Sequence, residues 1–132
     1  KAMLAKTIVF ITHDFDEAIR LANRIIIMEE GRIIQIGTPE DIVLNPKDQH
    51  IANFTKNVRR ATVITAGSLA MPHPGMDGIG VTVPWDTKII DAAPQVLASP
   101  DPVGVVDDSG QLVGVLPREA IINLVLERPA AA

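Results

Sequence analysis

The chain has 132 residues, of which 47% are hydrophobic, and its formal net charge is −4 at neutral pH. This length suits one or two small globular units, and no apolar run approaches the roughly 20 residues that span a bilayer. The absence of cysteine excludes disulfides and thiolate metal sites, while an aromatic content of 3% and an acidic second half argue against a nucleic-acid partner.

An apolar run at residues 8–11 stops at a Thr-His-Asp triplet, and an amphipathic stretch begins directly after it. The run is short and rich in β-branched residues, which predicts a strand buried on both faces. The apolar residues of the amphipathic stretch recur at helical spacing: Phe15, Ala18, Ile19 and Ala22. Asp14 is the expected N-cap of this helix, with Glu17 three residues later as in a capping box. His13 is therefore expected at the carboxyl end of a parallel-type strand, where open α/β sheets bind their ligands.

The predicted strand also bears on how much of the protein this sequence represents. The chain opens with Lys1 rather than an initiator Met and reaches the strand almost at once. A strand that is apolar on both faces needs neighbouring strands and covering helices, and the sequence predicts too few of them. We therefore expect the chain to be the tail of a longer protein.

A hairpin and two helices are predicted next. Residues 25–28 and 32–36 are rich in Ile and flank a short turn that ends in Gly31, which is a hairpin signal. Residues 38–41 combine an N-cap Thr, a Pro at the first helical position and two acids, which predicts a helix start. The apolar residues Ile51, Phe54 and Val58 mark another helix, which is expected to reach Arg59-Arg60.

Residues 67–80 contain four Gly and two Pro without periodicity, which predicts a linker or long loop. Beyond it, a strand at 81–83 precedes a helix capped by Asp86 or Thr87, in which Pro94 predicts a kink or an early end. Two strands, at 102–106 and 112–116, flank an Asp-Asp-Ser-Gly turn, and a last helix begins at Pro117. The predicted order over residues 81–127 is β-α-β-β-α.

The stretch TIVFITHDFDEAIRLANRIIIMEEGRIIQIGTPEDI resembles the carboxyl-terminal end of an ABC-transporter ATP-binding subunit, most of all in the importers of glycine betaine, proline and choline. The resemblance covers roughly residues 1–55, with the strand, THD, EA, the hairpin and the following helix in order. It implies that His13 is the switch histidine of the H-loop, which contacts the γ-phosphate of ATP in the closed ATPase dimer. An imidazole at a sheet edge can donate a hydrogen bond to a phosphoryl oxygen, which agrees with that role.

Other polar residues are interpreted as structural. His50 lies on a polar helix face and His73 in a Pro-rich loop, and no pair of histidines has metal-ligand spacing. The acids at residues 14, 16 and 17 are expected to cap a helix rather than to form an acid–base pair.

The sequence departs from the family where the nucleotide site is concerned. It lacks the Gly-rich phosphate loop, the signature motif and the catalytic carboxylate, which in the family lie upstream of the matched segment. The resemblance therefore implies ATP and Mg as cofactors of the intact protein only. We expect this chain alone to bind no cofactor tightly and to hydrolyse no ATP.

Residues 81–127 resemble a single CBS motif, through VGVVDDSGQLVGVL and the helix after it. CBS motifs that bind adenosine nucleotides usually place a Ser or Thr and an Asp after the second strand. Those positions are Pro117 and Ala120 here, which offer no polar side chain. Adenosine binding through this motif is therefore not expected.

The resulting interpretation is a mixed α/β fold. Residues 1–60 form the end of a RecA-like ABC nucleotide-binding domain, 61–80 a linker, 81–127 a CBS-like unit and 128–132 a tail. The expected function is that of a carboxyl-terminal fragment of an osmoprotectant importer's ATP-binding subunit, cytoplasmic and peripheral at the inner face of the cell membrane. The alternative is a non-catalytic CBS-type module for binding or dimerisation.

Two partners are expected. The intact transporter supplies membrane permease subunits. A second copy of the chain is expected because the strand at 8–11 lacks neighbours and a lone CBS-like unit buries little of its surface. We expect the apolar residues of this unit to exceed what one layer covers: Val103, Val105, Leu112, Val115, Ile121 and Val125.

Overall fold

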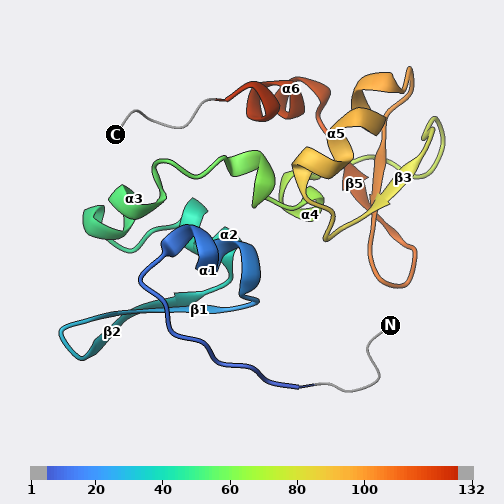
Figure 1. Ribbon diagram of the computed structural model, residues 1–132. Coiled ribbons are helices and arrows are strands. Elements are labelled where there is room, and N and C mark those ends of the chain that lie inside the picture. The colour runs from blue at the N-terminus through green and yellow to red at the C-terminus, as the bar shows by residue number, and fades with distance from the viewer. Residues whose placement is uncertain (1–5, 128–132) are drawn as a thin grey trace.

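The structure is a computed structural model that describes residues 6–127, and the chain folds into two packed groups of elements (Figure 1). The first group contains α1 (Phe15–Leu21), β1 (Ile25–Glu29), β2 (Arg32–Gly37), α2 (Pro39–Leu44) and α3 (Gln49–Thr55). The second contains the 3-10 turn η1 (Arg60–Thr62), α4 (Ala66–Leu69), β3 (Thr82–Pro84), α5 (Ile89–Ala98), β4 (Gly104–Val106), β5 (Leu112–Val115) and α6 (Arg118–Leu126). The predicted mixed α/β class is confirmed.

The first group is an antiparallel hairpin with three short helices on one face. Strands β1 and β2 pair with Ile26 opposite Ile36, and their two-residue turn has positive φ at Glu30 (51°) and Gly31 (76°). Such a turn matches the twist of the two strands, which explains the Gly in the predicted hairpin. The buried hydrophobic side chains of this group come from a strand and two helices: Ile25, Ile42 and Ile51.

Side-chain caps fix where the helices of the first group begin. Asp14 accepts a hydrogen bond from the backbone N–H of Glu17 at 3.2 Å, so the predicted cap of α1 is confirmed. Thr38 and Asp41 form a reciprocal capping box on α2, with distances of 3.0 and 3.1 Å. Helix α3 ends at Thr55, earlier than predicted, and the Thr55 hydroxyl donates to the Ala52 carbonyl oxygen at 3.0 Å. Such local bonds compete with helix continuation.

The prediction of a buried strand at residues 8–11 is wrong for this structure. These residues are coil, and Ile8, Val9 and Ile11 are 78%, 83% and 93% exposed. The strands of residues 6–127 form only the β1-β2 hairpin and the β3-β4-β5 sheet. An isolated strand leaves its backbone N–H and C=O groups without partners, so the segment stays unpaired.

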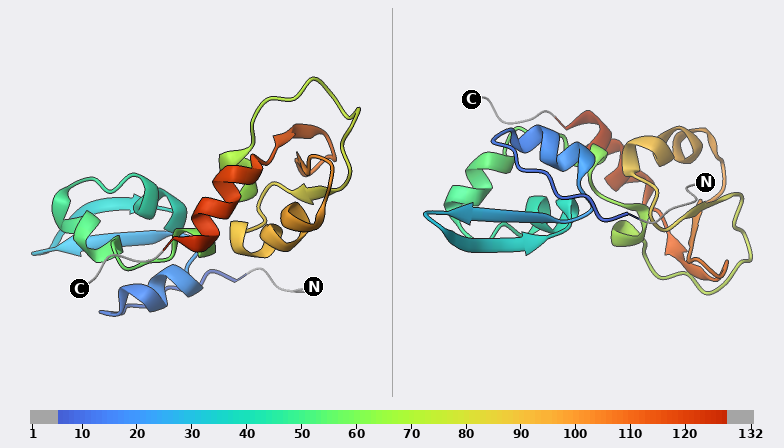
Figure 2. Two further views of the ribbon diagram at one scale, coloured as in Figure 1. Left: turned by 90° about the horizontal axis from the view of Figure 1, so that it is seen from above. Right: turned by 60° about the horizontal axis from the view of Figure 1, so that its bottom comes forward.

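The second group has the predicted β-α-β-β-α order. Strand β3 pairs in parallel with β4, with Val83 opposite Val105, and β4 pairs antiparallel with β5. Helices α5 and α6 pack against one another, as the views in Figure 2 also show. Helix α5 begins at Ile89, after Lys88 at its N-cap, and continues through Pro94 to Ala98, so the expected early end does not occur.

The second group has a buried core within one chain. Val103, Val105 and Ile121 are 2%, 0% and 0% exposed. Leu112, Val115 and Val125 stay half-buried, so a single layer covers only part of the apolar set that was expected to exceed it. Three buried residues come from the segment before β3: Ala61, Ile64 and Ala66. The segment before β3 therefore covers part of the core of the second group.

Residues 61–80 were expected to form a linker, but their first part packs on the second group. The Ile89 backbone N–H donates to the Ile64 carbonyl oxygen at 2.9 Å, and Met71 pairs with Val115 through two bonds of 2.8 Å. Residues 61–71 therefore belong to the second group, and the irregular loop follows them. The division of the whole chain into domains stays a prediction, and the predicted tail 128–132 lies outside the described residues.

The longest helix that the structure describes, α5, has ten residues, and no helix in this part of the chain is long and apolar enough to cross a membrane.

We expect Thr38→Ala to lower the free energy of unfolding by about 1 kcal/mol, because it removes the hydroxyl that caps α2. Denaturant titration of the two proteins measures this difference. Thr7→Ala, which makes the same change in exposed coil, is the matched control and should leave stability unchanged. Equal stabilities for the two variants would contradict the capping role.

Candidate functional site

His13 lies in the exposed coil directly before α1. The Thr12 hydroxyl accepts a hydrogen bond from the Asp14 backbone N–H at 2.9 Å, which orders the turn around the histidine. The imidazole itself is exposed, and no described residue forms a hydrogen bond with it. The ring is thus accessible to a ligand, but the sheet edge predicted to hold it is not formed by residues 6–127.

The described residues do not by themselves fit Mg-ATP. Among residues 6–127 no three His, Cys, Asp or Glu side chains converge where a metal ion would be held. The N-cap and first turn of α1, directly after His13, carry Asp14, Asp16 and Glu17, and these acids repel a triphosphate. A nucleotide site around His13 therefore requires groups that this part of the chain does not contain.

The other two histidines make local contacts. The Nε2 atom of His50 lies 3.6 Å from the carboxylate of Glu29, and its ring packs edge-on against Phe54. The Nδ1 atom of His73 lies 2.7 Å from the Gly75 carbonyl oxygen inside the 72–80 loop. Both contacts agree with the structural interpretation of these residues.

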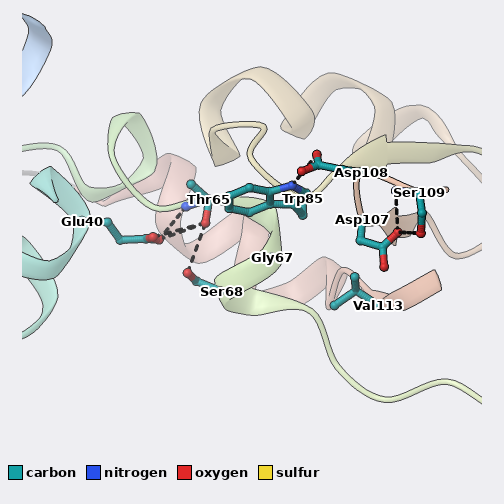
Figure 3. A pocket seen from close by; sticks show the side chains of 9 residues that line it. All are labelled: Glu40, Thr65, Gly67, Ser68, Trp85, Asp107, Asp108, Ser109 and Val113. Atoms are coloured by element: carbon teal, nitrogen blue, oxygen red, sulfur yellow. Dashed lines mark hydrogen bonds between the residues drawn. The ribbon is translucent and has the colours of Figure 1, made fainter. Parts of the chain in front are cut away.

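A hollow of about 590 Å³ lies where the two groups of elements meet (Figure 3). Its walls come from Glu40 of α2, three residues of the 65–68 segment, Trp85, the turn at 107–109 and Val113 of β5. We call this the Trp85 hollow. The lining residues come from four separate parts of the sequence, at 40, 65–68, 85 and 107–113, so the hollow exists only in the folded chain.

Trp85 is held in a fixed position although it is 41% exposed. Its indole N–H donates to the Asp108 carboxylate at 2.9 Å, and its carbonyl oxygen accepts from the Gly67 backbone N–H at 2.7 Å. A Cβ at residue 67 would lie 3.1 Å from the Trp85 carbonyl oxygen and 3.3 Å from its Cβ. Gly67 therefore permits the close approach of α4 to the tryptophan.

Asp107 shapes the turn beside the tryptophan. One carboxylate oxygen accepts from the Ser109 hydroxyl at 2.7 Å and from the backbone N–H groups of Ser109 and Gln111, each at 2.9 Å. Gly110 has φ of 86°, as the turn requires. The bond from the Ser109 side chain, followed by that from the Gln111 backbone, lowers the pKa of the Asp107 carboxyl below its ordinary 3.8. The group is therefore ionised at neutral pH.

Glu40 brings the first group of elements to the hollow. Its carboxylate accepts from the Thr65 backbone N–H at 2.7 Å and from the Thr65 hydroxyl at 3.2 Å. With the two aspartates of the turn, three carboxylates line the Trp85 hollow, and none of its lining residues is basic. The chemistry of the hollow is that of an aromatic ring among negative charges.

The sequence did not predict this hollow. The Asp-Asp-Ser-Gly segment was predicted only as a turn, and Trp85 was assigned no role. A signal was available, since the only tryptophan of the chain precedes an acid in a half that is poor in basic residues. The distance in sequence between the tryptophan and the turn hid their contact.

Comparison with known proteins gives a consistent set of relatives. No family model matches the chain. The chain is 42% identical over 127 residues to the trimethylamine N-oxide transport system ATP-binding protein of Ruegeria pomeroyi, and this match covers 96% of the chain and 37% of that relative. It is 38% identical to the glycine betaine/carnitine/choline transport ATP-binding protein of Bacillus subtilis, covering 89% of the chain and 31% of the relative.

A third relative, the glycine betaine/carnitine transport ATP-binding protein of Listeria monocytogenes, is 34% identical over 94% of the chain and 30% of its own length. The chain thus spans about a third of the length of these relatives. The matches agree with the family resemblance of the sequence.

The contribution of Asp107 to stability depends on pH. Because its folded pKa lies below the ordinary 3.8, the ionised carboxylate favours the folded chain above that value, and the advantage is lost as the pH falls through the folded pKa. We expect Asp107→Asn to lower the denaturation midpoint at neutral pH, with a smaller difference from the unsubstituted chain at about pH 3. Asp77→Asn is the control for the charge change. A difference that stays constant with pH would contradict this account.

Proposed function

Because the chain matches part of the ATP-binding subunits of osmoprotectant ABC importers, we propose that it is the carboxyl-terminal part of such a subunit. The whole subunit would hydrolyse ATP and thereby drive the import of a glycine betaine, choline or proline type of substrate. The observation that carries the proposal is the match of almost the whole chain to transport ATP-binding proteins. A longer parent protein is part of the proposal, since the relatives are about three times as long.

In this proposal His13 acts as the switch histidine. Its exposed ring, placed at the start of α1, is free to donate a hydrogen bond to the γ-phosphate of ATP. The described residues do not form a nucleotide pocket, so the phosphate-binding loop and the groups that hold Mg would come from the rest of the subunit and from its partner. The ATP supplies the free energy, and the chain supplies only this one contact.

The proposed setting is the cytoplasmic face of the cell membrane, with permease subunits as partners. A second copy of the chain is a further proposed partner. The outer face of the β1-β2 hairpin supports it, because this face exposes a contiguous set of large apolar side chains: Ile26, Met28, Ile33 and Ile36. Together with exposed residues 8–11, it gives the chain more apolar surface than a small monomer usually shows.

Residues 81–127 would form the regulatory, CBS-like unit of the subunit. Its buried core, and the hollow that it forms together with Glu40 and the 65–68 segment, favour a second candidate function, that of a non-catalytic binding or dimerisation module. Pro117 at the N-cap of α6 offers no side-chain hydrogen bond to a phosphate, which agrees with the expected lack of adenosine binding. A measurement of ATP hydrolysis by the intact subunit separates the two candidate functions, because only the transport ATPase would hydrolyse ATP.

We expect the 132-residue chain to bind Mg-ATP weakly or not at all and to hydrolyse none, because it lacks a phosphate-cradling loop. Isothermal calorimetry and a phosphate-release assay measure both properties. Micromolar binding, or turnover above that of a blank, would show that the chain holds a nucleotide site of its own.

In the intact subunit, His13→Ala should leave ATP binding unchanged and lower the turnover number by about 100-fold, because the lost contact matters most as charge develops in the transition state. His73→Ala, in the loop of the second group, is the matched control and should keep its turnover. Near-normal turnover of His13→Ala would contradict the proposed role.

We expect the chain to be a homodimer or a larger assembly at tens of micromolar concentration. Sedimentation or light scattering gives the mass, and replacing the outward-facing Ile26 by Lys should shift the assembly toward the monomer, since a charge on an apolar contact opposes its burial. A folded monomer at the chain mass of 14.2 kDa would rule out self-association.

A further inference from the structure

We propose that the pair Asp77-Gly78 is a site of covalent modification, at which the folded chain forms a succinimide and then isoaspartate. The proposal goes beyond the proposed function, because it concerns neither ATP nor transport. It rests on three observations, which are the order of the two residues, a backbone nitrogen that the fold leaves unengaged, and the open position of the turn that holds them.

The reaction is an attack within the chain. The backbone nitrogen of Gly78 bonds to the Cγ carbon of Asp77 and loses its proton, while one carboxyl oxygen leaves as water, which closes a succinimide ring. Water then adds to either carbonyl carbon of the ring and breaks its bond to the nitrogen. Breaking the bond to Cγ restores aspartate, whereas breaking the bond to the backbone carbonyl carbon leaves isoaspartate, with the main chain running through the former side chain. Because water is released and then taken up again, the conversion needs no oxidant or other reactant.

The residue that follows the aspartate distinguishes this site from the others. Asp77 is the only aspartate in the chain that precedes a glycine, and no asparagine precedes one. Glycine has no side chain to hinder the attack, and it reaches backbone conformations that other residues rarely adopt. Gly78 has φ of 82°, and a Cβ at this residue would meet no atom within 4 Å. The surroundings therefore leave this peptide group room to rotate.

The turn around the pair leaves the attacking nitrogen unengaged. The Ile79 backbone N–H donates to the Met76 carbonyl oxygen at 3.1 Å, which makes Asp77 and Gly78 the two central residues of a β-turn. Such a turn ties its first and last residues only. Among residues 6–127, none accepts a hydrogen bond from the Gly78 N–H and none donates one to the Asp77 carboxylate. Both residues are exposed, so water reaches the ring once it has formed.

The Asp108-Ser109 pair shows how the fold prevents the same reaction elsewhere. The Ser109 backbone N–H donates to the Asp107 carboxylate at 2.9 Å. The Asp108 carboxylate accepts from the Trp85 indole N–H at 2.9 Å. Both reacting groups are therefore held, and an attack requires this turn to open first.

The 72–80 loop has room for the longer backbone of isoaspartate. The loop lies at the outer edge of the second group (Figure 2). At its start Met71 pairs with Val115 through two bonds of 2.8 Å, and at its end the Gly80 N–H donates to the Pro102 carbonyl oxygen at 3.0 Å. The modified turn lies between these two ties and contributes no residue to either core. Because exposed loop tips tolerate such changes, isoaspartate should accumulate in the folded chain without unfolding it.

The test is incubation of the full 132-residue chain at neutral pH in water enriched in the heavy isotope of oxygen, followed by digestion with trypsin in ordinary water. Each opening of a succinimide adds one heavy oxygen, whichever product forms. Trypsin places Asp77 in the peptide 61–88 and Asp108 in the peptide 89–118. We expect at least about tenfold more label at Asp77 than at Asp108, located by fragmentation in the mass spectrometer, because the Asp108 turn must first open. Equal labelling of the two residues, or no label at Asp77, would overturn the proposal.

Variants and unfolding separate the chemistry of Asp77 from its structural setting. Asp77→Glu keeps the charge but requires a larger ring that closes far more slowly, so it should abolish the label in the peptide 61–88. Asp91→Glu makes the same change on an exposed helix position, is the matched control and should leave that label unchanged. Unfolding in guanidinium chloride should raise the labelling of Asp108 several-fold and that of Asp77 less, because only Asp108 is held by the fold. Label in the peptide 61–88 that persists in Asp77→Glu, or an Asp108 that reacts no faster when the chain is unfolded, would contradict the proposal.

Discussion

The carboxylate of Glu40 joins the two packed groups of this chain. It accepts from the backbone N–H and the hydroxyl of Thr65, at 2.7 and 3.2 Å, across a partly buried contact. A charge-assisted bond to a backbone N–H is stronger than a neutral one, and Leu44 of the same helix packs on the core of the second group. The capping box of Thr38 sets the first turn of α2 and thereby aims Glu40 at Thr65. The Trp85 hollow depends on this contact, because one of its walls is Glu40 itself.

A second link runs between the end of the first group and the end of α6. Arg59 donates to the Val125 carbonyl oxygen at 3.3 Å, and Arg60 lies 3.5 Å from the Glu127 carboxylate. Cations at a helix carboxyl end interact favourably with its dipole, although exposed pairs of this kind contribute little stability. The sequence predicts a helix that reaches these arginines, but α3 ends before them, at Thr55. In the structure they contact the end of α6, and the segment 61–66 directly after them enters the second core.

Features that depend on neighbours in sequence were predicted well, and features that depend on distant residues were not. The hairpin with its positive-φ Gly31, the cap of Thr38 and the Asp107 turn all follow from local hydrogen bonds that the residue types dictate. The strand at 8–11 failed because a strand forms only beside partners, and apolar composition alone does not supply them. The hollow was missed because its walls are brought together by the packing of four separate parts of the sequence. His13 keeps its predicted place before α1, but residues 6–127 do not form the sheet edge that was predicted to hold it.

The central claim is that the Glu40 contact fixes the two groups relative to one another, and hydrogen exchange of the Thr65 backbone amide tests it most directly. This amide donates across the junction to Glu40, so its protection reports the contact itself. The account predicts that the Thr65 amide exchanges as slowly as that of Ile64 in the neighbouring core, and that Glu40→Ala accelerates its exchange while the Ile64 amide stays protected. A Thr65 amide that exchanges at the rate of an open coil, beside a protected Ile64, would show that the two groups move independently and would contradict the account.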